Sequence, residues 1–160
     1  MFSVHVSRDP IDQLLCGDGF INTVFSNEKD RTEEQWHGFA KSWQANNYAL
    51  NVLTKKKCVN GKNTTIKCLE SAKDLLKRFT FILDQACLTE GLERMAQLLG
   101  KPIPILNDGS VRSAKATAKE RIPYVDVYDN LVEQNKMSIA LYEWSKSISL
   151  VKCEEKKIRL

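Results

Sequence analysis

Apolar residues recur at helical spacing along most of the chain, and this pattern predicts a protein built mainly of helices. One segment starts with a capping-box pattern, in which Thr32 is followed three residues later by Gln35. Another segment stops where Gly100 and Pro102 follow its last apolar residue. The expected helices cover residues 10–15, 32–43, 48–53, 65–79, 88–99, 125–133 and 138–151.

Two segments favour strands instead. Residues 3–6 form a short β-favouring run, and residues 79–83 form a dense run of aromatic and β-branched side chains. Directly after the first run, Asp9 suits a helix cap and Pro10 suits the first helical position. A buried strand needs neighbours on both edges to satisfy its backbone groups, and two strands are too few for a complete sheet. The sequence therefore predicts a helix-rich α/β chain with an exposed strand edge.

Composition is that of an ordinary globular protein. The 160 residues, of which 42% are hydrophobic, fit one domain over residues 1–160. Two prolines and the turn Asn107-Asp108-Gly109 predict a mobile loop over residues 101–121, and residues 152–160 are expected to form a tail. The net charge of +4 suits an anionic ligand but is too small to require nucleic acid. No aromatic and basic residues are spaced for base stacking, so we expect no nucleic-acid partner.

Two features bear on the compartment in which the protein folds. The sequence has no apolar stretch of membrane-spanning length and no signal-peptide pattern, so as written it is expected in the cytosol unless a segment lies upstream. Asn63 begins an N-glycosylation acceptor pattern, which favours a lumenal origin. Cys58 and Cys68 flank this pattern and could close a short disulfide. Such triplets also arise by chance, and five cysteines is an odd number. No second Cys or His pair has ligand spacing, so no metal is expected.

Five segments carry a resemblance to a known family. Residues 4–16 are similar to the pattern "LR-x-P-x-x-R-x-x-S", and residues 47–53 are similar to "NYxTRxL". Residues 72–99 resemble "A-x-x-x-L-x-x-F-D-F-V-L-L-x-E-x-F-x-E-S-L", and residues 106–112 resemble an "LN-x-S" loop followed by a basic residue. Residues 131–145 are close to "L-x-x-x-N-x-x-D-I-x-L-Y-x-x-A". In this order the segments resemble the Golgi carbohydrate sulfotransferases, P-loop enzymes that move a sulfonate from 3′-phosphoadenosine 5′-phosphosulfate (PAPS) to a sugar hydroxyl.

The resemblance implies a site for the 3′-phosphate of PAPS. Arg8 stands where the family has the Arg that holds this phosphate. Cys16 stands in place of the family's Ser and is a weaker hydrogen-bond donor. Arg112 and Lys115 lie in the loop whose basic residues close over the nucleotide in the family. For Arg8 the alternative is a surface ion pair with one of the aspartates that follow it, and for the loop residues it is a solvated loop.

The sequence contains no Gly-rich loop between a strand and a helix, which a PAPS enzyme needs for the 5′-phosphosulfate. Gly17-Asp18-Gly19 follows a predicted helix and is expected to be a plain turn. The resemblance therefore implies the helix-rich C-terminal part of a P-loop sulfotransferase fold, with an incomplete parallel sheet, a glycan acceptor and no assigned catalytic base. The parent enzyme is expected in the Golgi lumen, and this chain alone is expected to be incomplete or inactive. The alternative is a non-catalytic binding module for an acidic glycan or a protein partner.

Overall fold

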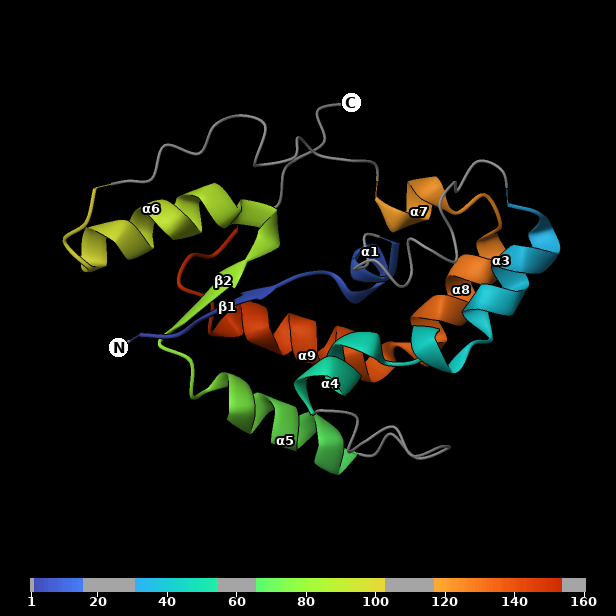
Figure 1. Cartoon of the computed structure of the whole chain (residues 1–160), viewed down its shortest axis with the longest axis horizontal. Coiled ribbons are helices and arrows are strands. Elements are labelled where there is room, and N and C mark those ends of the chain that lie inside the picture. The colour runs from blue at the N-terminus through green and yellow to red at the C-terminus, as the bar shows by residue number, and fades with distance from the viewer. Residues whose placement is uncertain (1, 16–30, 55–65, 103–116, 154–160) are drawn as a thin grey trace.

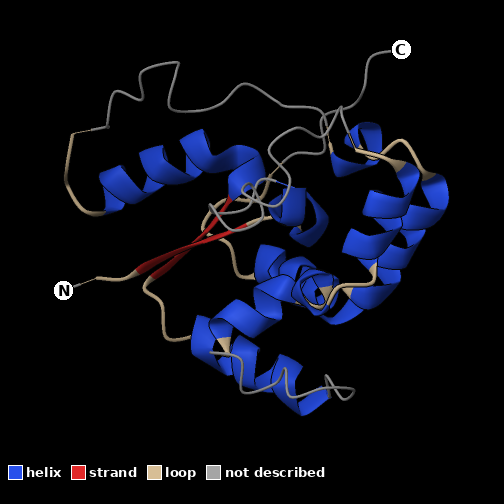
Figure 2. Cartoon of the chain, turned by 45° about the vertical axis from the view of Figure 1, so that its right-hand side comes forward, coloured by secondary structure: helices blue, strands red, loops and turns tan. Residues whose placement is uncertain are grey.

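Two short parallel strands lie between helices (Figure 1). The computed structural model describes residues 2–15, 31–54, 66–102 and 117–153. Within these ranges, strands β1 (Val4–Ser7) and β2 (Phe81–Asp84) pair in parallel, with Val4 opposite Phe81 and Ser7 opposite Asp84. Helices make up most of the rest of the described chain (Figure 2). The prediction of a helix-rich α/β chain with few strands is confirmed.

The helices begin near the positions that the sequence indicates. Asp9 caps the first helix, because its Oδ1 accepts hydrogen bonds from the backbone N–H of Ile11 at 2.9 Å and of Asp12 at 3.1 Å. Thr32 and Gln35 form the expected capping box. The helices are α1 (Pro10–Leu15), α3 (Glu33–Ala40), α4 (Tyr48–Leu53), α5 (Ile66–Leu76), α6 (Leu88–Leu98), α7 (Ala118–Arg121), α8 (Val125–Gln134) and α9 (Lys136–Ser147), with 3-10 turns η2 (Trp43–Ala45) and η3 (Gln85–Cys87).

Helices lie on both faces of the sheet (Figure 1). On one face α6 approaches closely at Gly91, where a Cβ atom would lie 3.2 Å from Cδ2 of Leu83. On the other face Ile82 joins a buried cluster with α4, α5 and α9. The members of this cluster are Leu50, Cys68, Leu69, Ala72, Leu76, Ile82 and Leu141. Successive side chains of β2 therefore pack into opposite layers, as the alternation of a strand requires.

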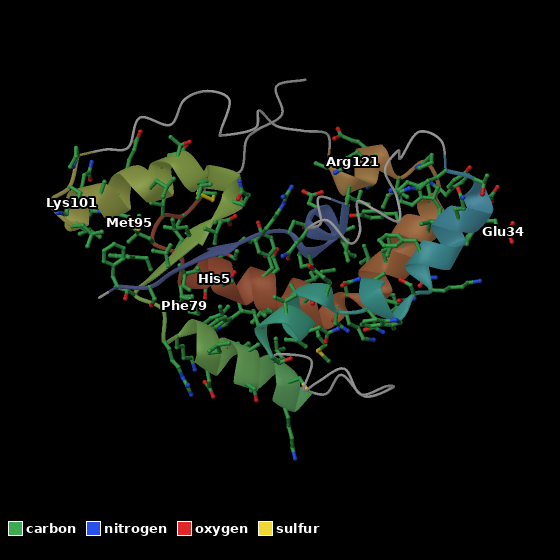
Figure 3. All side chains as sticks on the ribbon, in the orientation of Figure 1. His5, Glu34, Phe79, Met95, Lys101 and Arg121 are labelled. Atoms are coloured by element: carbon green, nitrogen blue, oxygen red, sulfur yellow. A yellow bond between two sulfur atoms is a disulfide. The ribbon has the colours of Figure 1, made fainter. Side chains whose placement is uncertain are left out.

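A second buried cluster joins α1, α3, α7 and α8. Trp36 is fully buried in it and meets the ring of Phe39 edge-on, with 6.4 Å between the ring centroids. Arg121 on α7 donates from Nη2 to the carbonyl of Leu15 at 3.0 Å, which holds α7 beside α1 (Figure 3). The members of the cluster are Ile11, Leu14, Leu15, Trp36, Phe39, Ala40, Ala45, Ala118, Ile122, Val127 and Leu131.

Buried amides and hydroxyls fix α4 against the junction of α8 and α9. Asn135 is fully buried, and its Nδ2 donates to the carbonyl of Ala45 at 2.6 Å. Asn47 Oδ1 accepts from the backbone N–H of Ser138 at 3.1 Å, and the Ser138 hydroxyl accepts from the backbone N–H of Leu50 at 3.2 Å. Asn47 adopts a positive φ of 44°, which Asn tolerates better than most residues. This network sets the position of α4 beside the sheet.

Two predictions about the ends of helices are corrected. The second helix was expected to run to Trp43, but α3 ends at Ala40 and Trp43 lies in the 3-10 turn η2 with 61% of its surface exposed. The last helix ends at Ser147 rather than near residue 151. It stops because the chain turns toward β2, where the Leu150 N–H donates to the carbonyl of Ile82 at 2.8 Å.

The predicted loop and tail are also corrected in part. Residues 103–116 of the predicted 101–121 loop lie outside the described residues, but its last four residues form α7, which starts at a capping box of Thr117 and Glu120. The start of the predicted tail over 152–160 is fixed to the rest of the chain, because Cys153 forms a disulfide with Cys87. In the described ranges, the helices are too short or too polar to cross a membrane.

Candidate functional site

The candidate site lies at the carboxyl end of the sheet, where β1 passes into α1. Arg8 occupies this junction, between the last residue of β1 and the cap of α1. It lines a small cavity of about 70 Å³. The polar residues that line the cavity are His5, Ser7, Arg8, Gln13, Ser138 and Tyr142. Ligands of open α/β sheets bind in the crevice outside the carboxyl ends of the strands, so this position suits a binding site.

The elements around the cavity come from distant parts of the sequence. The junction between β1 and α1 supplies Arg8, and α1 supplies Gln13. Helix α9 supplies Ser138 and Tyr142, and α4 contributes an apolar wall that includes Val52. The buried network described above fixes α4 against α9, so this wall is set by packing far from Arg8. The cavity is therefore formed by the tertiary structure rather than by one local motif.

A buried carboxylate marks the same end of β2. Asp84 is 3% exposed, and its Oδ1 accepts the backbone N–H of Ala86 at 2.9 Å and the hydroxyl of Tyr142 at 3.1 Å. Burial, then the negative charge of Asp84 and the hydrogen bond to it, raise the pKa of Tyr142 far above its ordinary value of 10.0. Tyr142 is thus a neutral phenol that donates to Asp84 and joins α9 to the end of β2.

The charge of the cavity comes mainly from Arg8. His5 lies half-buried on β1 beside Phe79, with 5.4 Å between the ring centroids (Figure 3). Burial lowers the pKa of His5 below its ordinary value of 6.5, so its imidazole is neutral at pH 7. Among the described residues that line the cavity, Arg8 supplies the permanent positive charge. A ligand with an anionic group suits this arrangement.

The volume of the cavity limits what can enter it. Pockets that enclose a drug-sized ligand measure about 300–1,000 Å³. The cavity of about 70 Å³ is far smaller. It has room for one small group, such as a phosphate. The rest of a larger ligand would lie outside the cavity. The cavity therefore suits one small group rather than a whole drug-sized ligand.

The structure places only part of the residue set that the sequence singles out. Arg8 lies at a strand-to-helix junction and lines a cavity, as its predicted role requires, but the role itself stays a prediction. Of the aspartates proposed as its ion-pair partners, Asp9 caps α1 and Asp12 accepts the backbone N–H of Ala118. The other predicted nucleotide ligands lie outside the described residues: Cys16, Arg112 and Lys115.

The cysteines give a partly different result from the prediction. Cys68 is buried on α5 and is disulfide-bonded, while Cys58 and the predicted glycosylation site Asn63 lie outside the described residues. The pairing of Cys58 with Cys68 therefore stays a prediction. The disulfide between Cys87 and Cys153 was not predicted; its members are 66 residues apart in the sequence, and no spacing pattern marks them.

Sequence reasoning also missed the pair of Asp84 and Tyr142. Asp84 follows the second apolar strand directly, and a carboxylate at the carboxyl end of a buried strand is a signal that could have found it. Tyr142 lies half-buried on α9, and its hydroxyl donates to Asp84. In the described part of the chain, no three His, Cys, Asp or Glu side chains gather as metal ligands would.

Comparison with known proteins adds no assignment to this geometry. No family model matches the chain, and neither a curated protein nor a solved structure is similar to it.

Proposed function

We propose that the chain is a sulfotransferase-like protein whose Arg8 cavity binds the 3′-phosphate of PAPS. The observation that carries this proposal is the position of Arg8, a permanent cation in a phosphate-sized cavity at the carboxyl end of a parallel sheet. A guanidinium offers a planar fork of donors that matches two phosphate oxygens. The other lining groups, such as the amide of Gln13, can donate further hydrogen bonds.

The packing of two resembling segments supports the proposal. Residues 47–53 and 131–145 are similar to two separate sulfotransferase patterns. Asn47 of the first segment bonds Ser138 of the second, and Asn135 of the second accepts the N–H of Tyr48 of the first at 3.3 Å. The residues that carry these two similarities therefore belong to one buried network. If the chain shares the sulfotransferase fold, this would explain why both segments occur in it and pack together.

In this proposal the chain corresponds to the C-terminal part of a P-loop sulfotransferase fold. Cys16, Arg112 and Lys115 would lie near the nucleotide, with a glycan hydroxyl as the acceptor and PAPS as the co-substrate. The catalytic base is not assigned. The disulfides suit an oxidising compartment such as the Golgi lumen. Since the sequence has no Gly-rich loop for the 5′-phosphosulfate, the chain alone is proposed to bind the nucleotide without transferring the sulfonate.

Calorimetry with adenosine 3′,5′-bisphosphate tests the proposal directly. Replacing Arg8 by Ala removes the charged donors, and we expect the affinity to fall about ten- to hundredfold, the range of a charge-assisted hydrogen bond. Arg8→Lys, which keeps the charge but not the planar fork, is expected to retain part of the affinity. Arg78→Ala is the matched control, because it removes one exposed Arg that does not line the cavity. Equal affinities for Arg8→Ala and the intact chain would refute the site.

The alternative, a module that binds an acidic glycan, draws less support from the described surface. Four lysines lie within salt-bridge distance of an acidic residue three positions earlier in the sequence: Lys73, Lys77, Lys136 and Lys146. Such pairs intersperse the two charges and weaken the field that a polyanion needs. We therefore favour the nucleotide site as the proposed function.

A further inference from the structure

The two outer edges of the sheet can be told apart by their backbone groups. In a strand, the N–H and C=O of one residue point to one side, and those of the next residue point to the other side. The N–H of Phe81 donates to the carbonyl of Ser3 at 3.1 Å, so Ser3 faces β2. By alternation His5 and Ser7 also face β2, and Val4 and Val6 face outward.

The outer edge of β2 is closed by the chain itself. Ile82 faces away from β1, and its carbonyl accepts the backbone N–H of Leu150 at 2.8 Å and the hydroxyl of Ser149 at 3.4 Å. The segment after α9 therefore runs beside this edge. The disulfide from Cys153 to Cys87 holds the segment in place. This edge has no need of a partner.

The outer edge of β1 has no such covering segment in the described residues. In the described residues, no backbone or side-chain group bonds the outward N–H and C=O of Val4 or Val6. Val6 is 42% exposed and Phe2, just before the strand, is 51% exposed. The strand carries no Lys, Glu or Pro of the kind that blunts an edge against pairing. A strand edge with unpaired backbone groups is a template for another strand.

An unpaired outer edge such as that of β1 is unusual in a parallel sheet. Parallel sheets occur almost always as buried sheets with several strands, and two strands alone are marginal. Helix α6 already covers one face of this sheet, and α9 covers the other face (Figure 1). The helices could therefore cover a sheet that is wider by one strand.

We propose that the outer edge of β1 accepts an added strand from a second polypeptide chain, apolar at alternate positions. A strand is the occupant because only an extended backbone presents donors and acceptors with the spacing of Val4 and Val6. Its side chains would cover Phe2 and Val6, whose exposed surfaces are apolar. The inference does not depend on nucleotide binding, since it concerns backbone groups rather than the Arg8 side chain.

Amide hydrogen exchange, followed by NMR on the intact chain, tests the proposal. The probe is a capped heptapeptide of alternating Val and Thr with a Lys at each end. Without it, we expect the amides of Val4 and Val6 to exchange fast and those of His5 and Ser7 to exchange slowly. With the peptide at about ten times its Kd, exchange at Val4 and Val6 should slow about tenfold. The same peptide with N-methylated valines, which lack the donors, should have no effect.

One protein variant and one further outcome complete the test. Val6→Pro removes an outward N–H and should abolish the protection, whereas Val6→Thr keeps the N–H and should preserve it. Unchanged exchange at millimolar peptide would overturn the proposal. So would slow exchange at Val4 and Val6 without peptide in a protein that light scattering finds monomeric, because the chain itself would then cover the edge. Arg8→Ala should leave the peptide effect intact, which separates this test from that of the nucleotide site.

Discussion

The outer edge of β2 and the outer edge of β1 belong to one small sheet, yet they are completed differently. At β2 the chain supplies its own cover, through the Leu150 N–H on Ile82 and the disulfide between Cys87 and Cys153. At β1 the described residues supply no cover, and the Arg8 cavity opens beside the end of the strand. In the described parts of the chain, backbone hydrogen bonds therefore close the outer edge of β2 but not that of β1.

The difference between the two edges indicates which part of the molecule binds other molecules. Groups that hold a fold together are satisfied within the chain, as Asp84 is by Tyr142 and by Ala86. Binding groups more often lie in loops and at incomplete parts of a fold. In the described residues, the cavity that Arg8 lines and the outward backbone groups of Val4 and Val6 both lie on the side of β1. The nucleotide proposal and the strand proposal thus concern adjacent surfaces.

The largest effect is expected from the covalent link at the β2 edge. The cysteines are 66 residues apart, and a loop of that length is worth about 4 kcal/mol in the chain-entropy account of disulfides. Replacing both Cys87 and Cys153 by Ser should lower the free energy of unfolding by about this amount. Denaturant unfolding under non-reducing conditions measures it.

The same disulfide variant gives a local readout. Cys153→Ser alone should lose nearly as much stability as the double variant, since either change opens the loop. The Leu150 amide should also exchange faster, because the segment that covers β2 is no longer tied at its end. A double variant as stable as the intact chain, with a protected Leu150 amide, would show that the cover holds without the link.

A smaller effect is expected at the carboxyl end of β2. Tyr142→Phe removes the hydroxyl that Asp84 accepts and leaves a buried carboxylate with one fewer donor, which should cost about 2 kcal/mol. The hydroxyl also sets a dependence on pH. Its pKa is raised in the folded chain, so above pH 10 the unfolded chain ionises first and the stability of the intact protein falls.

The loss of stability above pH 10 can be assigned to Tyr142 by comparison with another tyrosine. Tyr142→Phe should be less sensitive to pH above 10, because one of the tyrosines with a raised pKa is gone, while the raised pKa of Tyr128 remains. Tyr124→Phe, at a tyrosine packed against the other buried cluster, is the matched control and should keep the steeper loss of the intact chain. Parallel stability curves for the intact chain and Tyr142→Phe would contradict the assignment.

Much of the fold could be predicted because its signals are local. The cap at Asp9, the box of Thr32 with Gln35 and the two β-favouring runs each depend on a few neighbouring residues. Trp43 shows the limit of the periodic signal. Its spacing continues the apolar stripe of α3, but the helix has already ended at Ala40, and Ser42 caps the 3-10 turn that contains Trp43.

The candidate site could be predicted only where it is local. Arg8 follows from a strand run, a cap residue and Pro10 in succession, so its junction was predictable. The walls of the cavity come from α4 and α9, and their meeting depends on Asn47 and Ser138, 91 residues apart. Asp84 and Tyr142 are likewise 58 residues apart. A single sequence carries no signal for such contacts.

The smallest effect is expected at the open edge, and it tests the comparison most directly. Val6→Pro should change the free energy of unfolding by less than about 0.5 kcal/mol, because the lost N–H bonds nothing in the described chain. His5→Pro is the contrast, since the His5 N–H faces β2 and its loss should cost about 2 kcal/mol. Denaturant unfolding of both variants measures the difference. A Val6→Pro loss as large as that of His5→Pro would mean that the β1 edge is already paired, and the two edges of the sheet would then be alike.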